Sequence, residues 1–422
     1  MLARSLGGYA RATNRPVLDR RPIQNLLVLA ALGISVYMLA PPVSPLLSDA
    51  ELPFFGDRTE QARTLSVGPL PSDFEPIRRT PPRSPKGVLM TGYSAGGTKF
   101  DKLLRLLNET ELNAVVIDIK DERGEISWMP RSREARMAGA GLPKILDPAR
   151  TIRRLKRAGV YVIGRIVTFQ DSMLAEVRPD LAVQDLGGGI WRTAPKPGAD
   201  KGLAWLDPYS TEAQDYNIAL GVEAIELGFD EIQWDYVRFP TDGDANRMWF
   251  RHRDERLPHD VIHDFLARAR AQIVPRGAYM STDLFGLVAL VSDDLGIGQK
   301  LELIARQVDY ISLMLYPSHY NKPEYGIPDP EKEPYKTVSL SINDAKRRIQ
   351  GTGAKLRPWL QDFSLQVPYT PAEVRAQIDA VEDAGINEWL LWNARNDYTE
   401  DAVKSTLSKP PEPDGGAGTS RE

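Results

Sequence analysis

Short apolar runs alternate with amphipathic segments over the central part of the chain. Eight runs have the length and the content of β-branched and aromatic residues expected of buried strands. They cover residues 87–91, 114–119, 161–167, 231–234, 279–281, 310–315, 356–360 and 389–392. Strands that alternate with helices along a chain are typical of a parallel sheet.

The segments between these runs repeat their apolar residues at helical spacing. We expect helices over residues 98–107, 147–158, 211–227, 260–273, 344–349 and 371–383. Gly159, Gly228 and Gly385 follow three of them, where helices commonly end. Eight strand–helix units fit a closed barrel better than an open sheet, and no glycine-rich dinucleotide fingerprint follows an early strand. The sequence therefore predicts an α/β fold, a single (β/α)8 TIM barrel.

The N-terminal region has the pattern of a membrane signal. Five arginines, the last at Arg21, precede an uncharged apolar run at 26–40. Such a run is either a cleaved secretory signal or an uncleaved signal anchor, and a hydrophobic tail in the cytoplasm is a third alternative. We expect an anchor, because no good cleavage site follows and charge is absent from residues 23–45. The arginines would then keep the N-terminus in the cytoplasm and place the remaining chain outside it.

This interpretation divides the chain into five parts. A cytoplasmic basic tail covers residues 1–22, a transmembrane helix 23–42, and a proline-rich linker 43–84. The barrel covers 85–408, and the composition of 409–422 is typical of a disordered tail. The barrel domain would be tethered to the membrane by a single pass.

Composition excludes several function classes. A net charge of −4 provides no basic field for nucleic acid. The absence of cysteine removes disulfides and thiolate catalysis. His259 and His263 have the spacing of zinc ligands, but the metalloprotease glutamate is missing between them. No phosphate-binding loop is found. We expect neither a metal nor a cofactor.

Candidate chemistry gathers where the predicted strands end, which is where barrel active sites lie. The residues at this level combine carboxylates, cations and aromatic rings, a set suited to a polyhydroxylated ring. Proposed contacts to substrate are Tyr93, Asp118, Lys120, Arg165, Asp171, Trp205, Arg238, Tyr316 and Trp392. Trp191 and Trp205 would either form a sugar platform or pack a long loop.

Two carboxylates stand out, because glycoside hydrolysis requires a pair of them beside one bond. Asp235 ends the fourth strand and Asp283 the fifth, so they would be neighbours at the barrel mouth. We expect their oxygens about 5–5.5 Å apart, the separation of retaining enzymes, with the pKa of Asp283 raised by the pairing. The alternatives are an ion pair of Asp235 with Arg238, and a helix cap or turn at Asp283.

The motifs YSAGG, VVIDIKDERG, GRIVTFQD, WLDP, GFDEIQWDYVRFP and ISLMLYPSHY together resemble the bacterial "putative glycosyl hydrolase" domain family. The resemblance covers residues 85–393 and implies a barrel distantly similar to the alpha-amylase and alpha-galactosidase clans. It implies that Asp235 is the nucleophile and Asp283 the acid/base. Gln233 departs from the arginine that amylases have at this point, and Asp283 departs from their glutamate.

The resulting hypothesis is a glycosidase acting on an envelope or extracellular polysaccharide from the bacterial inner membrane, with its catalytic domain in the periplasm. The alternative is a catalytically inactive barrel that binds glycan during export or envelope assembly. A metal-dependent deacetylase or phosphatase would need a His/Asp cluster that the sequence does not offer.

Overall fold

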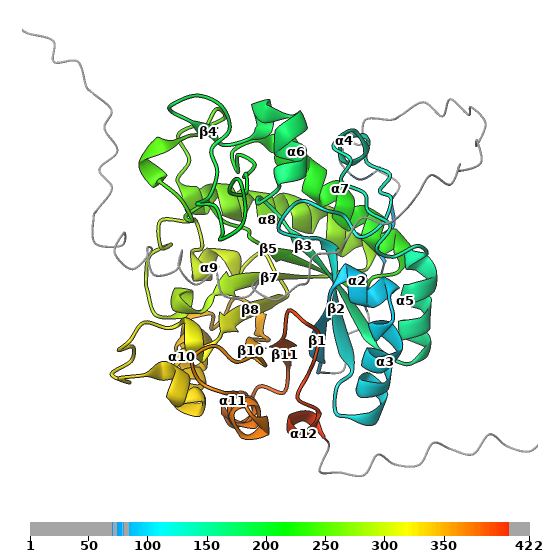
Figure 1. The fold of residues 1–422 in the computed structure, drawn as a ribbon, viewed down its shortest axis with the longest axis vertical. Helices are drawn as coiled ribbons and strands as arrows, with labels where there is room; N and C mark the ends of the chain where they lie inside the picture. Colours follow the sequence, from blue (N-terminus) through cyan, green and yellow to red (C-terminus); the bar gives the residue numbers. More distant parts are fainter. Residues whose placement is uncertain (1–69, 71–73, 78, 80–83, 405–422) are drawn as a thin grey trace, which may run out of the picture.

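Parallel strands close into a barrel in the computed structural model, which describes residues 70, 74–77, 79 and 84–404 (Figure 1). The hydrogen-bonded order is β10-β11-β1-β2-β3-β5-β7-β8-β9, and β10 also pairs with β8, which closes the ring. The strands are β1 Lys86–Met90, β2 Ala114–Lys120, β3 Tyr161–Val167, β5 Glu231–Asp235, β7 Tyr279–Phe285, β8 Tyr310–Leu315, β9 Lys355–Leu356, β10 Trp359–Gln361 and β11 Trp389–Trp392. The predicted (β/α)8 barrel is confirmed.

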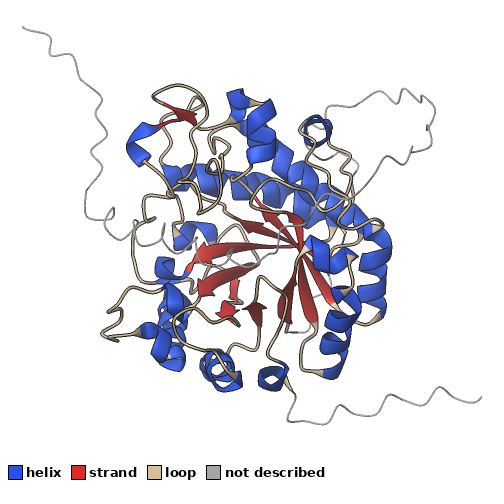
Figure 2. Cartoon of the chain, viewed as in Figure 1, coloured by secondary structure: helices blue, strands red, loops and turns tan. Residues whose placement is uncertain are grey.

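An outer ring of helices covers the strands (Figure 2). Its main members are α3 Lys99–Glu109, α5 Pro148–Arg157, α7 Thr211–Leu227, α8 Pro258–Ile273, α10 Pro334–Arg348 and α11 Pro371–Asp383. Because the helices cover the outer face and side chains fill the inside, every residue of β2 is buried. This double coverage explains why the strands read as apolar runs in the sequence.

The predicted helix limits were accurate where caps are strong. Ser210 accepts a hydrogen bond from the Ala213 amide at the start of α7, and Gly228 ends it with a φ of 107°. Gly159 and Gly385 also adopt positive φ after α5 and α11. The prediction for α10 was wrong, because that helix begins at Pro334 rather than 344. Its first half contains serine, threonine and valine, which are weak helix formers.

Short elements occupy the loops. The helices are α2 Gly92–Gly96, α4 Arg133–Met137, α6 Ser172–Val177, α9 Leu301–Ile304 and α12 Glu400–Val403. Single 3-10 turns are η1 Pro179–Leu181, η2 Ala245–Arg247, η3 Val274–Arg276, η4 Gly286–Ala289, η5 Pro317–His319 and η6 Pro330–Lys332. The loops after β3 and β5 pair through β4 Gln184–Asp185 and β6 Met248–Trp249, an antiparallel pair outside the barrel (Figure 1).

Most of the predicted N-terminal segments, including the anchor at 23–42, lie outside the described residues, as does the tail at 409–422. No helix in the described ranges is both long and apolar enough to cross a bilayer. Part of the predicted linker does contact the barrel. The Ile77 amide donates to Pro275, and Arg79 forms a 2.6 Å ion pair with Asp309. These contacts lie at the amino ends of the strands, opposite the predicted site.

Candidate active site

One buried arginine organises the carboxyl ends of strands β2, β3 and β5. Arg165 on β3 lies directly opposite Asp118 on β2, and its Nη1 donates to Asp118 Oδ1 at 2.6 Å. Its Nε and Nη2 contact Asp235 Oδ2 at 2.8 and 2.7 Å. A further contact runs from Nη2 to Glu122 Oε1, at 3.2 Å. The guanidinium therefore holds three carboxylates at fixed positions on its rim.

Asp235 receives a second donor from the turn that follows it. Tyr236 has a φ of 47°, uncommon for a residue with a side chain, and its amide donates to Asp235 Oδ1 at 2.7 Å. Asp235 does not form the ion pair with Arg238 that was the alternative to a catalytic role. Arg238 instead pairs with Asp242 at 3.2 Å and packs over the ring of Trp205. The side chain of Asp235 thus faces Arg165 inside the barrel.

Asp283 on β7 completes the group. Its Oδ1 accepts a hydrogen bond from Trp359 Nε1 at 2.8 Å, whereas its buried Oδ2 has no hydrogen-bond partner among the described residues. Burial is the main cause that raises the pKa of Asp283 well above its ordinary value, and the charge of Asp235 adds to it. The direction agrees with the prediction, although burial rather than pairing dominates.

The distance between the two acids is bounded by Arg165. Its Nε lies 2.8 Å from Asp235 Oδ2 and 4.0 Å from Asp283 Oδ2. These two oxygens therefore lie at most 6.8 Å apart, the sum of the two contacts. The bound keeps Asp283 within reach of a bond that Asp235 also contacts. It includes both the retaining range and the shortest inverting separation, so the predicted shorter distance stays a prediction.

Asp118 adds a third titratable acid. Burial raises its pKa to about 6, although the nearby Arg165 works in the opposite direction. We call Asp118, Glu122, Arg165, Asp235 and Asp283 the mouth cluster. Four carboxyl groups surround one guanidinium, so the cluster cannot be neutral with every acid ionised. A protonated acid beside an ionised one is the arrangement that general acid catalysis requires.

Aromatic side chains line the adjacent wall. Trp392 lies under the Arg165 guanidinium, with 5.1 Å between ring centroid and Cζ. Tyr316 packs against Trp392 and against Phe363. The charges of Asp283 and Asp235 contribute to raising the pKa of Tyr316, after burial as the first cause, which places this phenol beside the acids. The partly exposed rings of Phe363 and Trp392 can stack on the apolar face of a sugar, whereas the ring of Tyr316 is buried.

Lys120 and Asp171, two of the predicted substrate contacts, pair with each other beyond a bulge in β2. The register between β2 and β3 shifts between Asp118 and Lys120. Lys120 consequently forms a fully buried 2.7 Å ion pair with Asp171 and lies over the ring of Tyr216 on α7. Asp171 also caps α6 through the Leu174 amide. Lys120 and Asp171 therefore join the loops and the helix layer rather than the mouth cluster.

Three further aromatic residues that were considered as sugar contacts lie outside the mouth cluster. Trp205 is completely buried and Trp191 nearly so, which leaves neither ring a free face for sugar. They pack the loop after β3, the alternative considered for them. Tyr93 on α2 is exposed, and Lys144 lies over its ring, 4.9 Å from the centroid. It lies on the rim of the barrel rather than in the mouth cluster.

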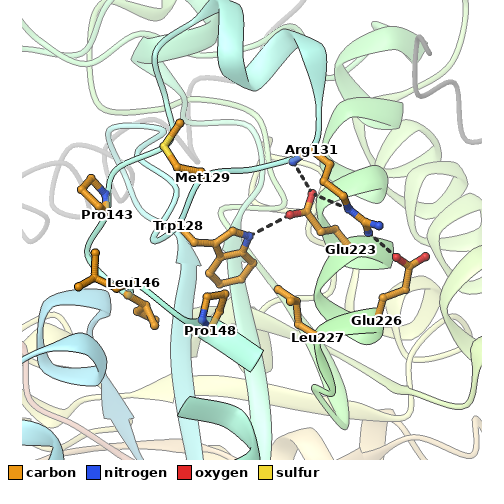
Figure 3. A pocket seen from close by; sticks show the side chains of 10 residues that line it. Trp128, Met129, Arg131, Pro143, Leu146, Pro148, Glu223, Glu226 and Leu227 are labelled. Carbon is orange, nitrogen blue, oxygen red and sulfur yellow. Dashed lines mark hydrogen bonds and ion pairs between the residues drawn. The ribbon is translucent and has the colours of Figure 1, made fainter. Parts of the chain in front are cut away.

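A separate hollow of about 530 Å³ opens on the outer face, between the loop after β2 and helix α7 (Figure 3). One of its two carboxylates, Glu223, accepts hydrogen bonds from Trp128 Nε1 and the Arg131 amide, both at 3.0 Å. The remaining lining is largely apolar, with Met129 and Leu146 exposed. Glu226, the other carboxylate of the lining, pairs with Arg131, so this hollow combines two acids with one arginine on a largely apolar wall.

Sequence reasoning missed several neighbours of the acids. Glu122, His319, Trp359 and Phe363 were not among the proposed site residues. The pairing of Arg165 with Asp118 could have been inferred, since adjacent strands in register bring inward residues together. Within the described part of the chain, no three His, Asp or Glu side chains form a potential metal site.

Comparison with known proteins gives the fold and the family. The "putative glycosyl hydrolase" domain profile matches residues 87–398. No curated protein matches the chain. The glycoside hydrolase domain of PgaB (BpsB) from Bordetella bronchiseptica is 14% identical with a TM-score of 0.52, covering 77% of this chain and all of that domain.

Two other solved structures match with lower TM-scores. A hypothetical protein from Ruminiclostridium thermocellum is 34% identical over 50% of this chain and 98% of its own, with a TM-score of 0.42. TtGalA, an alpha-galactosidase from Thermus thermophilus, is 16% identical with a TM-score of 0.46, covering 75% of this chain and 59% of its own. Because the profile matches most of the chain, including the whole mouth cluster, the protein belongs to the "putative glycosyl hydrolase" domain family.

Proposed function

We propose that the protein hydrolyses an O-glycosidic bond of an envelope or extracellular polysaccharide while anchored to the inner membrane. The observation that supports this most directly is the pair formed by Asp235 and Asp283. One acid is fixed by Arg165 and the Tyr236 amide, and the other has a raised pKa and an oxygen to which no residue in the described part of the chain donates. The family membership supports the reaction class, and the arginine-rich N-terminus motivates the anchor.

In the proposed reaction, Asp235 Oδ2 attacks the anomeric carbon while Asp283 donates its proton to the leaving oxygen. The glycosidic bond breaks, and the electron pair leaves with the departing alcohol. Water, deprotonated by Asp283, then attacks the same carbon and releases Asp235 and the sugar. Arg165 holds the Asp235 carboxylate in position before the first step and after the second, and the aromatic wall holds the ring.

Asp235→Asn and Asp283→Asn test this proposal. Each keeps the shape of the side chain but removes a carboxyl group, so we expect turnover to fall by about 10⁴-fold or more, with a melting temperature within a few degrees of the parent. The assay uses aryl glycosides and purified envelope polysaccharides with the full chain. Asp264→Asn, on the outer face of α8, is the matched control. Near-normal turnover in Asp235→Asn would remove it from the mechanism.

Addition of azide to Asp235→Ala sharpens the assignment. A small anion can enter the space left by a nucleophile, so activity on aryl glycosides should partly return and yield a glycosyl azide. Recovery in Asp283→Ala but not in Asp235→Ala would exchange the two roles.

The contacts of Arg165 are also compatible with a second function, the binding of a glycan without hydrolysis. Because Asp235 Oδ2 is engaged by two nitrogens of Arg165, the barrel could bind a glycan without cleaving it. Saccharide binding by the parent chain, with no product from any polysaccharide tested, would support this alternative over hydrolysis.

A further inference from the structure

His319 lies beside the proposed site yet takes no part in the reaction just described. It ends η5, directly after β8, and its ring packs edge to face against Tyr316 at 5.3 Å between centroids. The ring of Phe363 lies 5.8 Å away on another side. His319 therefore forms part of the same aromatic wall as Tyr316, next to the mouth cluster.

The amide of Gln361, completely buried, has a defined orientation. Its Nε2 donates to the Phe363 carbonyl at 2.9 Å, so its Oε1 must be the acceptor atom. This oxygen accepts hydrogen bonds from the Ser318 amide at 3.1 Å and from Ser318 Oγ at 2.9 Å. The single proton of the Ser318 hydroxyl is therefore directed toward Gln361.

This orientation determines which nitrogen of His319 carries the proton. Ser318 Oγ lies 2.8 Å from His319 Nδ1. Since the hydroxyl proton points at Gln361, the oxygen must accept, and Nδ1 must be the protonated nitrogen. Burial lowers the pKa of His319 to about 4, so the ring is neutral near pH 7. Nε2 is then a bare acceptor, and within the described residues it has no hydrogen-bond partner.

We propose that His319 Nε2 accepts a hydrogen bond from a hydroxyl group of a pyranose ring that packs against the partly exposed rings of Phe363 and Trp392. Ser318 and Gln361 act as positioning residues that hold the imidazole in the accepting tautomer. The inference rests on the proposed function, because it assigns a sugar to the same site. A neutral acceptor selects for a donor on the ligand, and it gives a carboxylate group on the sugar no favourable contact.

The test uses two variants of His319 in the Asp235→Asn chain, which we expect to bind sugar without turnover. The amide of asparagine lies near the position of Nδ1 and can retain the bond to Ser318, whereas the amide of glutamine reaches the position of Nε2. Binding of methyl glucoside, galactoside, mannoside and N-acetylglucosaminide is measured by titration calorimetry. For the sugar that binds best, its singly deoxygenated analogues are then measured.

We expect His319→Asn to weaken the best sugar about tenfold, and His319→Gln to weaken it less, consistent with loss or retention of one acceptor. One deoxy analogue should lose about the same factor in the parent and nothing further in His319→Asn. Equal losses for every analogue in parent and variant would overturn the inference. Ser318→Ala should give an intermediate loss if the tautomer matters, and none if Ser318 is only structural.

The two proposals can fail separately. If Asp235→Asn is inactive and sugar binds equally to His319→Asn and its parent, the role of His319 is wrong and hydrolysis stands. If Asp235→Asn retains turnover, the catalytic proposal fails, independently of the result for His319. If neither His319 variant folds, as judged by thermal melting, Ser318→Ala with the deoxy analogues decides the question, because it leaves the ring in place.

Discussion

Each end of the barrel buries an arginine that contacts carboxylate, but the number of carboxylates around it differs between the two ends. At the amino ends of the strands, Arg357 forms a bidentate pair with Glu231. The two oxygens of Glu231 also accept from Ser281 and Tyr161. We call these four residues the floor cluster. One cation meets one anion there, and every carboxylate oxygen has a donor.

The mouth cluster has the opposite balance. Arg165 faces Asp118, Glu122 and Asp235 directly, with Asp283 at 4.0 Å. Burial and mutual repulsion favour protonation of the surplus acids, and none of the described residues donates a hydrogen bond to Asp283 Oδ2. A one-to-one pair in which both carboxylate oxygens have donors suits stability, whereas surplus acids with raised pKa values suit proton transfer. The comparison shows that buried charge alone does not identify a functional site. An excess of buried acids over cations does.

The largest expected effect separates the clusters by stability. Glu231→Gln leaves Arg357 as a buried cation without a counter-ion, which should cost about 3–5 kcal/mol in the free energy of unfolding. Asp235→Asn should cost less, because Arg165 keeps Asp118 and Glu122. Urea denaturation of both variants checks this. Equal losses would show that the clusters are energetically alike and break the comparison.

The next effect concerns the pH dependence of stability. The pKa of Asp118 is about 6 in the folded protein against an ordinary 3.8. The folded state therefore binds this proton more tightly, and the free energy of unfolding should fall as pH rises from about 4 to about 6, by up to about 3 kcal/mol. Asp118→Asn should lack this component. Denaturation curves between pH 4 and 7.5 measure it, and parallel curves for parent and variant would refute the shift.

Much of this architecture could be predicted from the sequence. All eight strands were located, because double-sided burial makes them apolar runs between capped helices. The β4–β6 pair was missed, since two-residue strands show no periodicity. The seventh strand divides into β9 and β10 around Pro358, which has no amide hydrogen to donate to a ladder.

The end of the barrel at which the site lies could be predicted, but the contacts between its side chains could not. Asp118, Asp235 and Asp283 lie where strands end, so topology alone gathered them at the mouth. Whether Asp235 contacts Arg165 or Arg238 depends on which side chains point inward, and the turn at Tyr236 directs Arg238 away. The bulge between Asp118 and Lys120 likewise changes the side of the sheet on which Lys120 lies. Nothing in an isolated strand sequence shows where a bulge falls.

A smaller effect probes the acid itself. The hydrogen bond from Trp359 favours the ionised form of Asp283 and so opposes the raised pKa. Trp359→Phe removes this donor, which should raise the pKa of Asp283 further. The basic limb of the kcat/KM profile, where the general acid loses its proton, should then move to higher pH, by about one unit or less.

The matched control is Trp389→Phe at the floor end, where the ring is equally buried and its Nε1 contacts Glu382 instead. This variant loses a similar volume from the core without touching a site acid, so its basic limb should stay in place. A basic limb that moves to lower pH in Trp359→Phe, or moves equally in both variants, would show that Asp283 is not the group being titrated.

The smallest effect tests whether the floor end is structural alone. Arg79 joins the segment before the barrel to Asp309 and stacks on Tyr279, with 4.3 Å between Cζ and the ring centroid. Asp309 would still accept from the Met280 amide at 2.9 Å and face Arg270 at 3.6 Å after Arg79→Ala. We therefore expect a loss of only about 0.5–1 kcal/mol, as for a partly exposed ion pair, with kcat/KM unchanged. Arg79→Lys keeps the charge but loses the planar stacking, so its free energy of unfolding should lie between those of the parent and of Arg79→Ala. Thermal melting and the aryl glycoside assay measure both quantities. A drop in kcat/KM larger than the stability loss explains would couple this segment to the mouth, and the division between a structural floor and a chemical mouth would no longer hold.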